Sequence, residues 1–116
     1  MNFDKLIIVD FDDTLCLHPP NDSTNIMLGK PNAPLIAKLN DLHSNGYRIE
    51  IYTARGHYSC KSRLEAEAKY RNIIIQWLHD NNVKFDWLSF NKPFGVIYID
   101  DKAVRPDELD RLDLLT

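Results

Sequence analysis

The feature that most constrains this chain is a short apolar run that ends abruptly in carboxylates. Residues 6–9 read LIIV, and Asp10, Asp12 and Asp13 follow directly. A continuous β-branched run is typical of a strand buried on both faces of a parallel sheet. Open parallel sheets bind ligands beyond the carboxyl ends of their strands. We therefore expect a parallel α/β sheet whose first strand delivers acids to the binding edge.

The remainder of the chain alternates between helical and extended patterns. The expected elements are a helix from Pro34 to a stop at Asn45-Gly46, a strand over 47–53, a helix over about 60–79, strands over 85–90 and 96–99, and a short helix from Pro106. The order β-α-β-α-β-β-α predicts a three-layer, Rossmann-like parallel sheet in one domain over residues 1–116. A proline-rich loop over residues 16–34 precedes the first helix, and so long an irregular segment is usually functional or mobile.

Composition narrows the classes of partner. The 116 residues carry a formal net charge of −3, whereas nucleic-acid binders usually show a basic surplus, so we expect no nucleic-acid partner. No apolar run approaches the roughly 18 residues that a membrane span needs, and the first apolar run is too short for a signal peptide. These features predict a cytoplasmic protein without a membrane partner, in which Cys16 and Cys60 are reduced thiols.

Polar side chains gather where the predicted strands end, namely four acids and a hydroxyl: Asp10, Asp12, Thr53, Asp100 and Asp101. Lys92 adds an ammonium group from the loop just before the strand over 96–99. Crowded carboxylates repel by about 4 kcal/mol per pair at ~4 Å and an effective dielectric near ~20. A hard cation such as Mg²⁺, which takes carboxylates, waters and substrate phosphate as ligands, relieves that repulsion. The pattern therefore predicts a phosphate held against Mg²⁺ and a carboxylate.

These residues resemble the motifs of the haloacid dehalogenase superfamily of phosphatases. The DxDxT motif matches residues 10–14, the strand-end hydroxyl matches Thr53 in IYTAR, the lysine matches Lys92 in NKP, and the acidic pair matches YIDD at 98–101. The motifs follow in the family order over nearly the whole chain. Within the superfamily, the chain looks closest to small bacterial capsule and polysaccharide biosynthesis phosphatases, on its IVDFDDTLC, TAR, NKP and YIDDKAVRPDE segments.

The resemblance implies a mechanism. Asp10 would attack phosphorus to form an aspartyl-phosphate, and Asp12 would serve as general acid and then as general base. Thr53 and Lys92 would stabilise the phosphoryl oxygens.

The resemblance also implies a set of ligands. Mg²⁺ would be held by the side chain of Asp10, the backbone carbonyl of Asp12 and Asp101, with Asp100 bound or adjacent. Arg55 and His57 border the expected pocket, where a substrate contact and a solvated loop role are both open. For His18, in the long loop, a role in the loop structure is favoured over a contact with the substrate.

The family likeness also bears on the substrate. The chain has no room for a separate cap domain, so we expect an open site, which a homo-oligomer could cover. The expected substrate is a small phosphorylated metabolite, with a sugar phosphate favoured on family likeness alone.

Three alternatives stay open. The first is a nucleotide phosphatase of the same fold, and the second is a retained fold that serves as a scaffold. The third is a receiver-like phosphoacceptor module, although its phosphoacceptor Asp would end the third strand and residues 87–90 supply none.

Overall fold

Three parallel strands form the sheet of this protein. The computed structural model describes residues 5–18, 28–57 and 59–115. Strands β1 (Leu6–Asp10), β4 (Arg48–Tyr52) and β5 (Trp87–Ser89) lie in the order β1-β4-β5. Ile51 of β4 stands opposite both Val9 of β1 and Leu88 of β5. The carboxyl ends of the three strands therefore meet at one edge, as the apolar patterns predicted.

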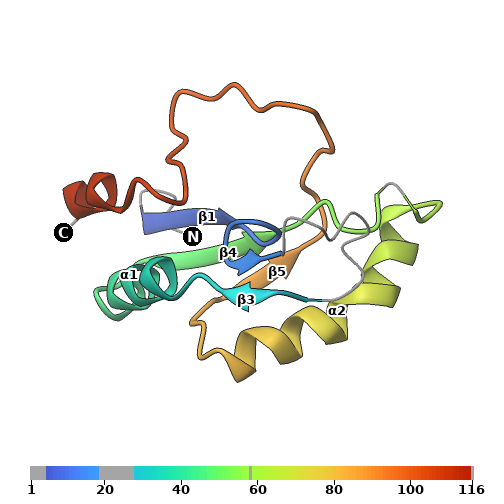
Figure 1. The fold of residues 1–116 in the computed structure, drawn as a ribbon, viewed down its shortest axis with the longest axis horizontal. Coiled ribbons are helices and arrows are strands. Elements are labelled where there is room, and N and C mark those ends of the chain that lie inside the picture. The colour runs from blue at the N-terminus through green and yellow to red at the C-terminus, as the bar shows by residue number, and fades with distance from the viewer. Residues whose placement is uncertain (1–4, 19–27, 58, 116) are drawn as a thin grey trace.

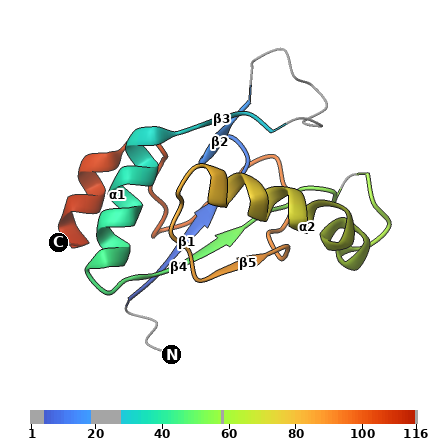
Figure 2. The same ribbon diagram turned by 90° about the horizontal axis from the view of Figure 1, so that it is seen from below.

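Two helices cover one face of this sheet. Helix α1 (Ala33–Ser44) starts where the side chain of Asn32 accepts a hydrogen bond from the Leu35 amide, and α2 (Arg63–Asp80) starts where Ser62 accepts from the Glu65 amide. Each cap satisfies an amide that has no partner inside its helix. Each helix connects neighbouring parallel strands, and both lie on the same side of the sheet (Figure 1), in front of it when the molecule is seen from below (Figure 2).

The core lies between this sheet face and the helices. Ile49 and Ile51 of β4 are buried in one cluster with leucines of both helices, among them Leu42 and Leu78. Phe11, directly after β1, is fully buried in that cluster, and its ring meets the ring of Trp77 edge to face at 5.3 Å between centroids. The chain is therefore anchored in the core between the first two acids.

The predicted loop over residues 16–34 contains a small antiparallel pair of strands. Strand β2 (Cys16–Leu17) pairs with β3 (Lys30–Pro31). The part of the predicted loop over residues 19–27 lies outside the described residues. The two ends of the loop are therefore joined next to the end of β1.

The predicted fourth strand over residues 96–99 is not formed. Residues 91–108 instead run in a wide arch from β5 to the C-terminal helix (Figure 1), and Val96, Ile97 and Ile99 are largely exposed. The physical reason is that the backbone of residues 96–99 pairs with no strand in the described part of the chain. The hydroxyl of Tyr98 instead holds the start of the arch, where it accepts from the Gly95 amide and donates to the Pro93 carbonyl.

The short C-terminal helix starts later than predicted. It is a 3₁₀ helix, η2 (Leu109–Leu115), rather than a helix from Pro106. It packs beside α1, where Lys38 binds Asp113, and Leu112 enters the core.

The observed architecture is a small α/β fold with a three-stranded parallel sheet and two helices, in keeping with a Rossmann-like arrangement. A complete three-layer core is not seen in the residues that the structure describes. Within those same residues, no helix has both the length and the apolar character that crossing a membrane requires.

Candidate active site

A tight turn follows β1 and carries the first acids. The carbonyl of Phe11 accepts hydrogen bonds from the amides of Leu15 and Cys16, at 3.1 and 3.0 Å. The turn includes a left-handed residue, Asp13, with φ of 58°, a conformation that aspartate tolerates better than most residues. The hydroxyl of Thr14 donates back to Oδ2 of Asp10 at 3.2 Å. The threonine of the DxDxT pattern, Thr14, thus orders its first aspartate, Asp10.

Asp10 is paired with Lys92. The ammonium Nζ lies 3.0 Å from Oδ1 of Asp10, and the Asp10 side chain remains 23% exposed. Burial raises the pKa of Asp10, whereas the hydrogen bond and charge of Lys92, together with the Thr14 hydroxyl, act to lower it. Lys92 also lies over the ring of Tyr98 at 4.5 Å and that of Tyr52 at 5.5 Å. An accessible, partly desolvated carboxylate therefore sits beside a fixed cation.

Asp12 is held by three side chains. Its Oδ1 receives hydrogen bonds from Nη2 of Arg55 at 2.6 Å and from Nε2 of His18 at 2.9 Å. Its Oδ2 receives one from Oγ1 of Thr53 at 3.2 Å. Thr53, buried at the end of β4, in turn accepts a hydrogen bond from the Arg55 amide at 2.9 Å. The structure thus brings together four of the residues predicted from sequence: Asp10, Asp12, Thr53 and Lys92.

The two residues expected to border the pocket are both placed by the loop after β4. The Arg55 side chain is 4% exposed, and its guanidinium binds Asp12. Nε2 of His57 lies 2.9 Å from the carbonyl of Phe90, so His57 ties this loop to the chain after β5. Between them, Gly56 has φ of 86°, and a Cβ there would lie 2.6 Å from the Cβ of Ala66 on α2. Glycine thus lets the loop pass close to the helix. A substrate contact of Arg55 or His57 stays a prediction.

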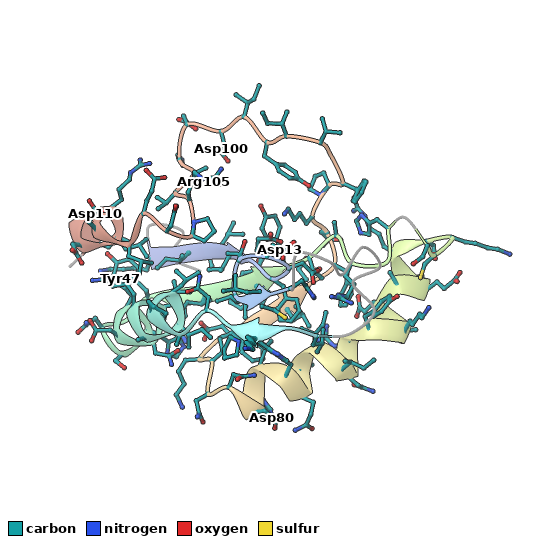
Figure 3. All side chains as sticks on the ribbon, in the orientation of Figure 1. Asp13, Tyr47, Asp80, Asp100, Arg105 and Asp110 are labelled. Carbon is teal, nitrogen blue, oxygen red and sulfur yellow. The ribbon has the colours of Figure 1, made fainter. Side chains whose placement is uncertain are left out.

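The acidic pair of the arch is not brought to this cluster. Asp100 and Asp101 are exposed, and Oδ1 of Asp100 accepts a hydrogen bond from the Lys102 amide. Figure 3 places Asp100 on the arch, whereas Asp13 lies at the end of β1. Over the described ranges, no three acids, histidines or cysteines stand together as a metal site. The structure therefore supplies part of the donor set predicted for Mg²⁺.

That partial set has the right chemistry for Mg²⁺. The carboxylate of Asp10 and the backbone carbonyl of Asp12 offer hard oxygen atoms, and Mg²⁺ in proteins uses one or two carboxylates and keeps several waters. Asp10 is open to solvent on one side. Asp100 and Asp101 stay predicted ligands.

Sequence reasoning did not include His18 in the site. Its imidazole is almost fully buried against Asp12 and Arg55. No local spacing indicates this contact, because it depends on how β2 leads the chain back across the end of β1. The signal available in the sequence was its position at the start of the long loop.

A separate hollow lies on α2. It measures about 450 Å³ and is lined by Leu28, Asn72, Ile73, Gln76, Trp77 and Asp80. None of these residues belongs to the acid cluster. We therefore place the candidate site on the chemistry at the sheet edge and not on this hollow.

Comparison with known proteins gives one informative match. No family model and no curated protein matches the chain. The crystal structure of a structural-genomics target from Vibrio cholerae shares 31% sequence identity with this chain, with a TM-score of 0.74. The match covers 96% of this chain and 95% of the Vibrio cholerae chain. At this identity and coverage, the chain belongs to the same protein family as this Vibrio cholerae protein.

Proposed function

We propose that this protein is a Mg²⁺-dependent phosphomonoester hydrolase of the haloacid dehalogenase type that works through an aspartyl-phosphate. One observation carries the proposal. Asp10 is paired with Lys92 at 3.0 Å, directly beside Asp12, which is bound to Thr53. Separate segments of the chain contribute these groups to one sheet edge, in the combination that the superfamily motifs imply.

The surroundings of Asp10 suit a nucleophile. Its carboxylate is exposed enough to meet a phosphate, and burial on its other side destabilises the charged form. An oxygen of Asp10 forms the bond to phosphorus while the bond to the leaving oxygen breaks. Lys92 offers positive charge for the phosphoryl oxygens, which is the main protein contribution to phosphoryl transfer. The O–H of Thr53, donated to Oδ2 of Asp12 in this structure, would turn to a phosphoryl oxygen when phosphate binds.

Asp12 supplies the proton transfers. As an acid it gives a proton to the departing alkoxide, and as a carboxylate it takes one from the water that hydrolyses the aspartyl-phosphate. The enzyme then returns to its starting protonation state. Efficient acid–base catalysis requires that such a group be held within hydrogen-bond reach of the reacting atoms. Three side-chain partners fix the Asp12 carboxylate in one place, which would serve that role.

Mg²⁺, when bound, neutralises charge on the phosphate, and Asp10, Asp12, Asp101 and Asp100 are the residues that would hold it. Because Asp100 and Asp101 lie on the arch, away from Asp10, this assignment requires the arch to move toward the end of β1. Strand β1 pairs with β4 on one edge, and in the described residues no strand pairs with its other edge. Ile8 in the middle of β1 is 54% exposed, and the apolar residues over 96–99 are exposed as well.

We infer that residues 96–99 join β1 as a fourth parallel strand when the ion and phosphate bind. A parallel strand there would bury these apolar side chains and deliver Asp100 and Asp101 to the edge that carries Asp10. This step would also complete the Rossmann-like core that the sequence predicts.

Hydrogen exchange tests this step without reference to turnover. Amides over residues 96–99 should become protected when Mg²⁺ and inorganic phosphate are added. Asp101→Asn should abolish that protection, and Asp107→Asn, at an exposed acid of the same arch, should keep it. Unchanged exchange over 96–99 in the wild type with both additions would refute the docking.

The substrate we favour is a phosphorylated sugar or a related small metabolite of polysaccharide biosynthesis. The described residues contain no separate cap domain, which leaves the specificity to loops or to a second copy of the chain. A nucleotide phosphatase activity is the alternative that a substrate panel distinguishes. The favoured substrate rests on resemblance to the family and not on a contact in the structure.

The test is phosphate release from sugar phosphates, nucleotides and an aryl phosphate, with and without Mg²⁺. We expect Mg²⁺-dependent turnover in the wild type, none in Asp10→Asn, and full turnover in the control Asp41→Asn, at an exposed position of α1. Multiple turnovers by Asp10→Asn would remove the nucleophile assignment. A stable phosphoprotein without turnover would favour the receiver-like alternative, and no reaction at all would favour a scaffold.

A further inference from the structure

We propose that His18 is the positioning residue that orients Asp12 and directs its catalytic proton to Oδ2. The inference deepens the proposed function and depends on the acid–base role of Asp12. Nε2 of His18 lies 2.9 Å from Oδ1 of Asp12, and a carboxylate oxygen can only accept a hydrogen bond. When Asp12 is ionised, Nε2 therefore carries the hydrogen atom in this contact, and the same Nε2 lies 3.3 Å from Nη2 of Arg55.

The hydrogen bonds of Asp12 leave one position open. A carboxylate offers about four lone-pair positions, two on each oxygen. His18 and Arg55 both occupy Oδ1, at 2.9 and 2.6 Å, and Thr53 occupies one position on Oδ2. The remaining position is on Oδ2, so the proton that Asp12 gives and takes is placed on that oxygen.

Both the side chain and the backbone of His18 are held in place. Its side chain is 2% exposed. Its backbone amide donates to Oδ1 of Asp13 at 3.2 Å. The preceding strand, β2, pairs with β3, and a Cβ on Gly29, just before β3, would lie 1.9 Å from the carbonyl oxygen of Leu17 and 3.1 Å from the Cα of His18. A residue restrained in this way can restrain its neighbour.

Burial also separates this role from direct substrate binding. With its imidazole enclosed and its Nε2 on Asp12, His18 reaches the reaction through Asp12. Arg55 alone would fix the position of Oδ1 and leave rotation of the carboxylate plane to the hydroxyl of Thr53. The second donor on Oδ1 limits that rotation, because two hydrogen bonds to one oxygen define two directions.

The experiment compares leaving groups. An alkyl phosphate such as a sugar phosphate needs a proton on its leaving oxygen, whereas p-nitrophenyl phosphate has a leaving group that departs without one. The ratio kcat/KM reports only the steps up to departure of the leaving group. A misplaced Asp12 should therefore lower kcat/KM for the alkyl phosphate and spare that for the aryl phosphate.

We expect His18→Leu to lower kcat/KM for the alkyl phosphate by roughly 10- to 100-fold, a share of the roughly 10²–10⁴ that general acid catalysis contributes. The change should lie in kcat and not in KM, and p-nitrophenyl phosphate should lose less than about threefold, since it does not need that acid. His18→Gln, whose amide nitrogen reaches the position of Nε2, should recover most of the lost rate. If the leucine variant does not fold, His18→Asn replaces it, because the shorter amide cannot reach Asp12.

The outcomes separate the two proposals. Equal losses for both substrates in a folded variant, or no loss for either, would overturn the positioning role while the phosphatase assignment stands. A leucine or asparagine variant that matches the glutamine variant would also overturn it. A wild type that hydrolyses neither phosphate would overturn the proposed function itself and this role with it.

Discussion

Replacing Asp86 by alanine should destabilise the fold without touching the candidate site. Asp86 lies just before β5, beside the amino end of β4, and the site lies at the carboxyl end. Oδ2 of Asp86 accepts a hydrogen bond from the backbone amide of Ile49 at 2.7 Å, and Oδ1 accepts one from Arg48 at 3.0 Å. Nε2 of His43 lies 3.4 Å from Oδ2. The carboxylate thus joins the end of α1 to the start of β4.

The magnitude follows from these contacts. The hydrogen bond from the Ile49 amide to the Asp86 carboxylate is charge-assisted, and the Asp86 side chain is only 16% exposed. Loss of this hydrogen bond should therefore cost about 1.5–3 kcal/mol. Arg48 is mostly exposed, and its ion pair should add no more than about 0.5 kcal/mol. For a domain of this size, about 2 kcal/mol corresponds to a fall in Tm of roughly 8 °C.

The stabilisation should depend on pH with a definite sign. Burial acts to raise the pKa of Asp86, but the Ile49 amide, the Arg48 hydrogen bond and the charges of His43 and Arg48 outweigh it, so the pKa lies below its ordinary value. A carboxyl group whose pKa is lowered by folding contributes its stabilisation above the unfolded pKa of about 3.9 and loses it as pH falls through the folded pKa. The difference between wild type and Asp86→Ala should therefore be full near neutral pH and shrink below about pH 4.

Urea denaturation followed by circular dichroism, repeated across pH, measures this difference. Asp86→Asn is the matched control: it keeps an oxygen for the Ile49 amide and loses the charge, so it should fall between wild type and alanine. A loss below about 0.5 kcal/mol for alanine, or a loss that grows toward acid, would contradict the reasoning.

Two further substitutions test how the core and the loops hold the site. Phe11→Leu should lower the free energy of unfolding by roughly 1–2 kcal/mol, because it removes the edge-to-face contact with Trp77 and leaves unfilled space in the core. Urea denaturation measures this loss, and an unchanged midpoint would show that Phe11 does not anchor the turn. Gly56→Ala should cost about 1–2 kcal/mol for the positive φ alone, with further loss from the clash with Ala66; its melting temperature and its kcat/KM should both fall, and a wild-type value of either would count against the tight passage of this loop.

The sequence was a good guide where a structure depends on nearby residues. The first helix was expected from Pro34 to a stop at Asn45-Gly46, and α1 spans Ala33–Ser44. The helix expected over about 60–79 is α2, Arg63–Asp80. Side chains within one turn cap both helices, so the signal is local. The meeting of Asp10, Asp12 and Thr53 was also predictable, because parallel strands carry their final residues to one edge. Their catalytic roles stay predictions.

The sequence was a poor guide where a structure depends on a distant partner. The apolar run over 96–99 fits a buried strand, but a strand forms only when its backbone pairs with a neighbouring edge, and in this structure residues 96–99 pair with none of the described strands. The contact of His18 with Asp12 depends on the pairing of β2 with β3, which joins residues on either side of a long loop. Neither partner could be read from local pattern.

The charges of the site lead to the last prediction. The crowded acids suggest that a cation is needed to relieve their repulsion, yet in the structure each has a cation from the chain itself: Lys92 on Asp10 and Arg55 on Asp12. A bound Mg²⁺ must therefore share Asp10 with the ammonium 3.0 Å away. Lys92→Met removes that competing charge and keeps an apolar chain of similar length.

This variant should bind Mg²⁺ roughly tenfold more tightly, since a nearby unit charge acts on the ion with more than ~1.4 kcal/mol even at an effective dielectric near ~20. The same variant should lose most of its turnover, because the phosphoryl oxygens lose their ammonium. Calorimetric titration measures the first effect and phosphate release the second. Weaker Mg²⁺ binding by Lys92→Met would mean that Lys92 organises the ligands and does not compete with the ion. Unchanged turnover would remove the lysine from the chemistry. If Lys92 pairs with Asp10 until phosphate binds and then moves to the phosphoryl oxygens, the variant should show tighter Mg²⁺ binding together with lost turnover.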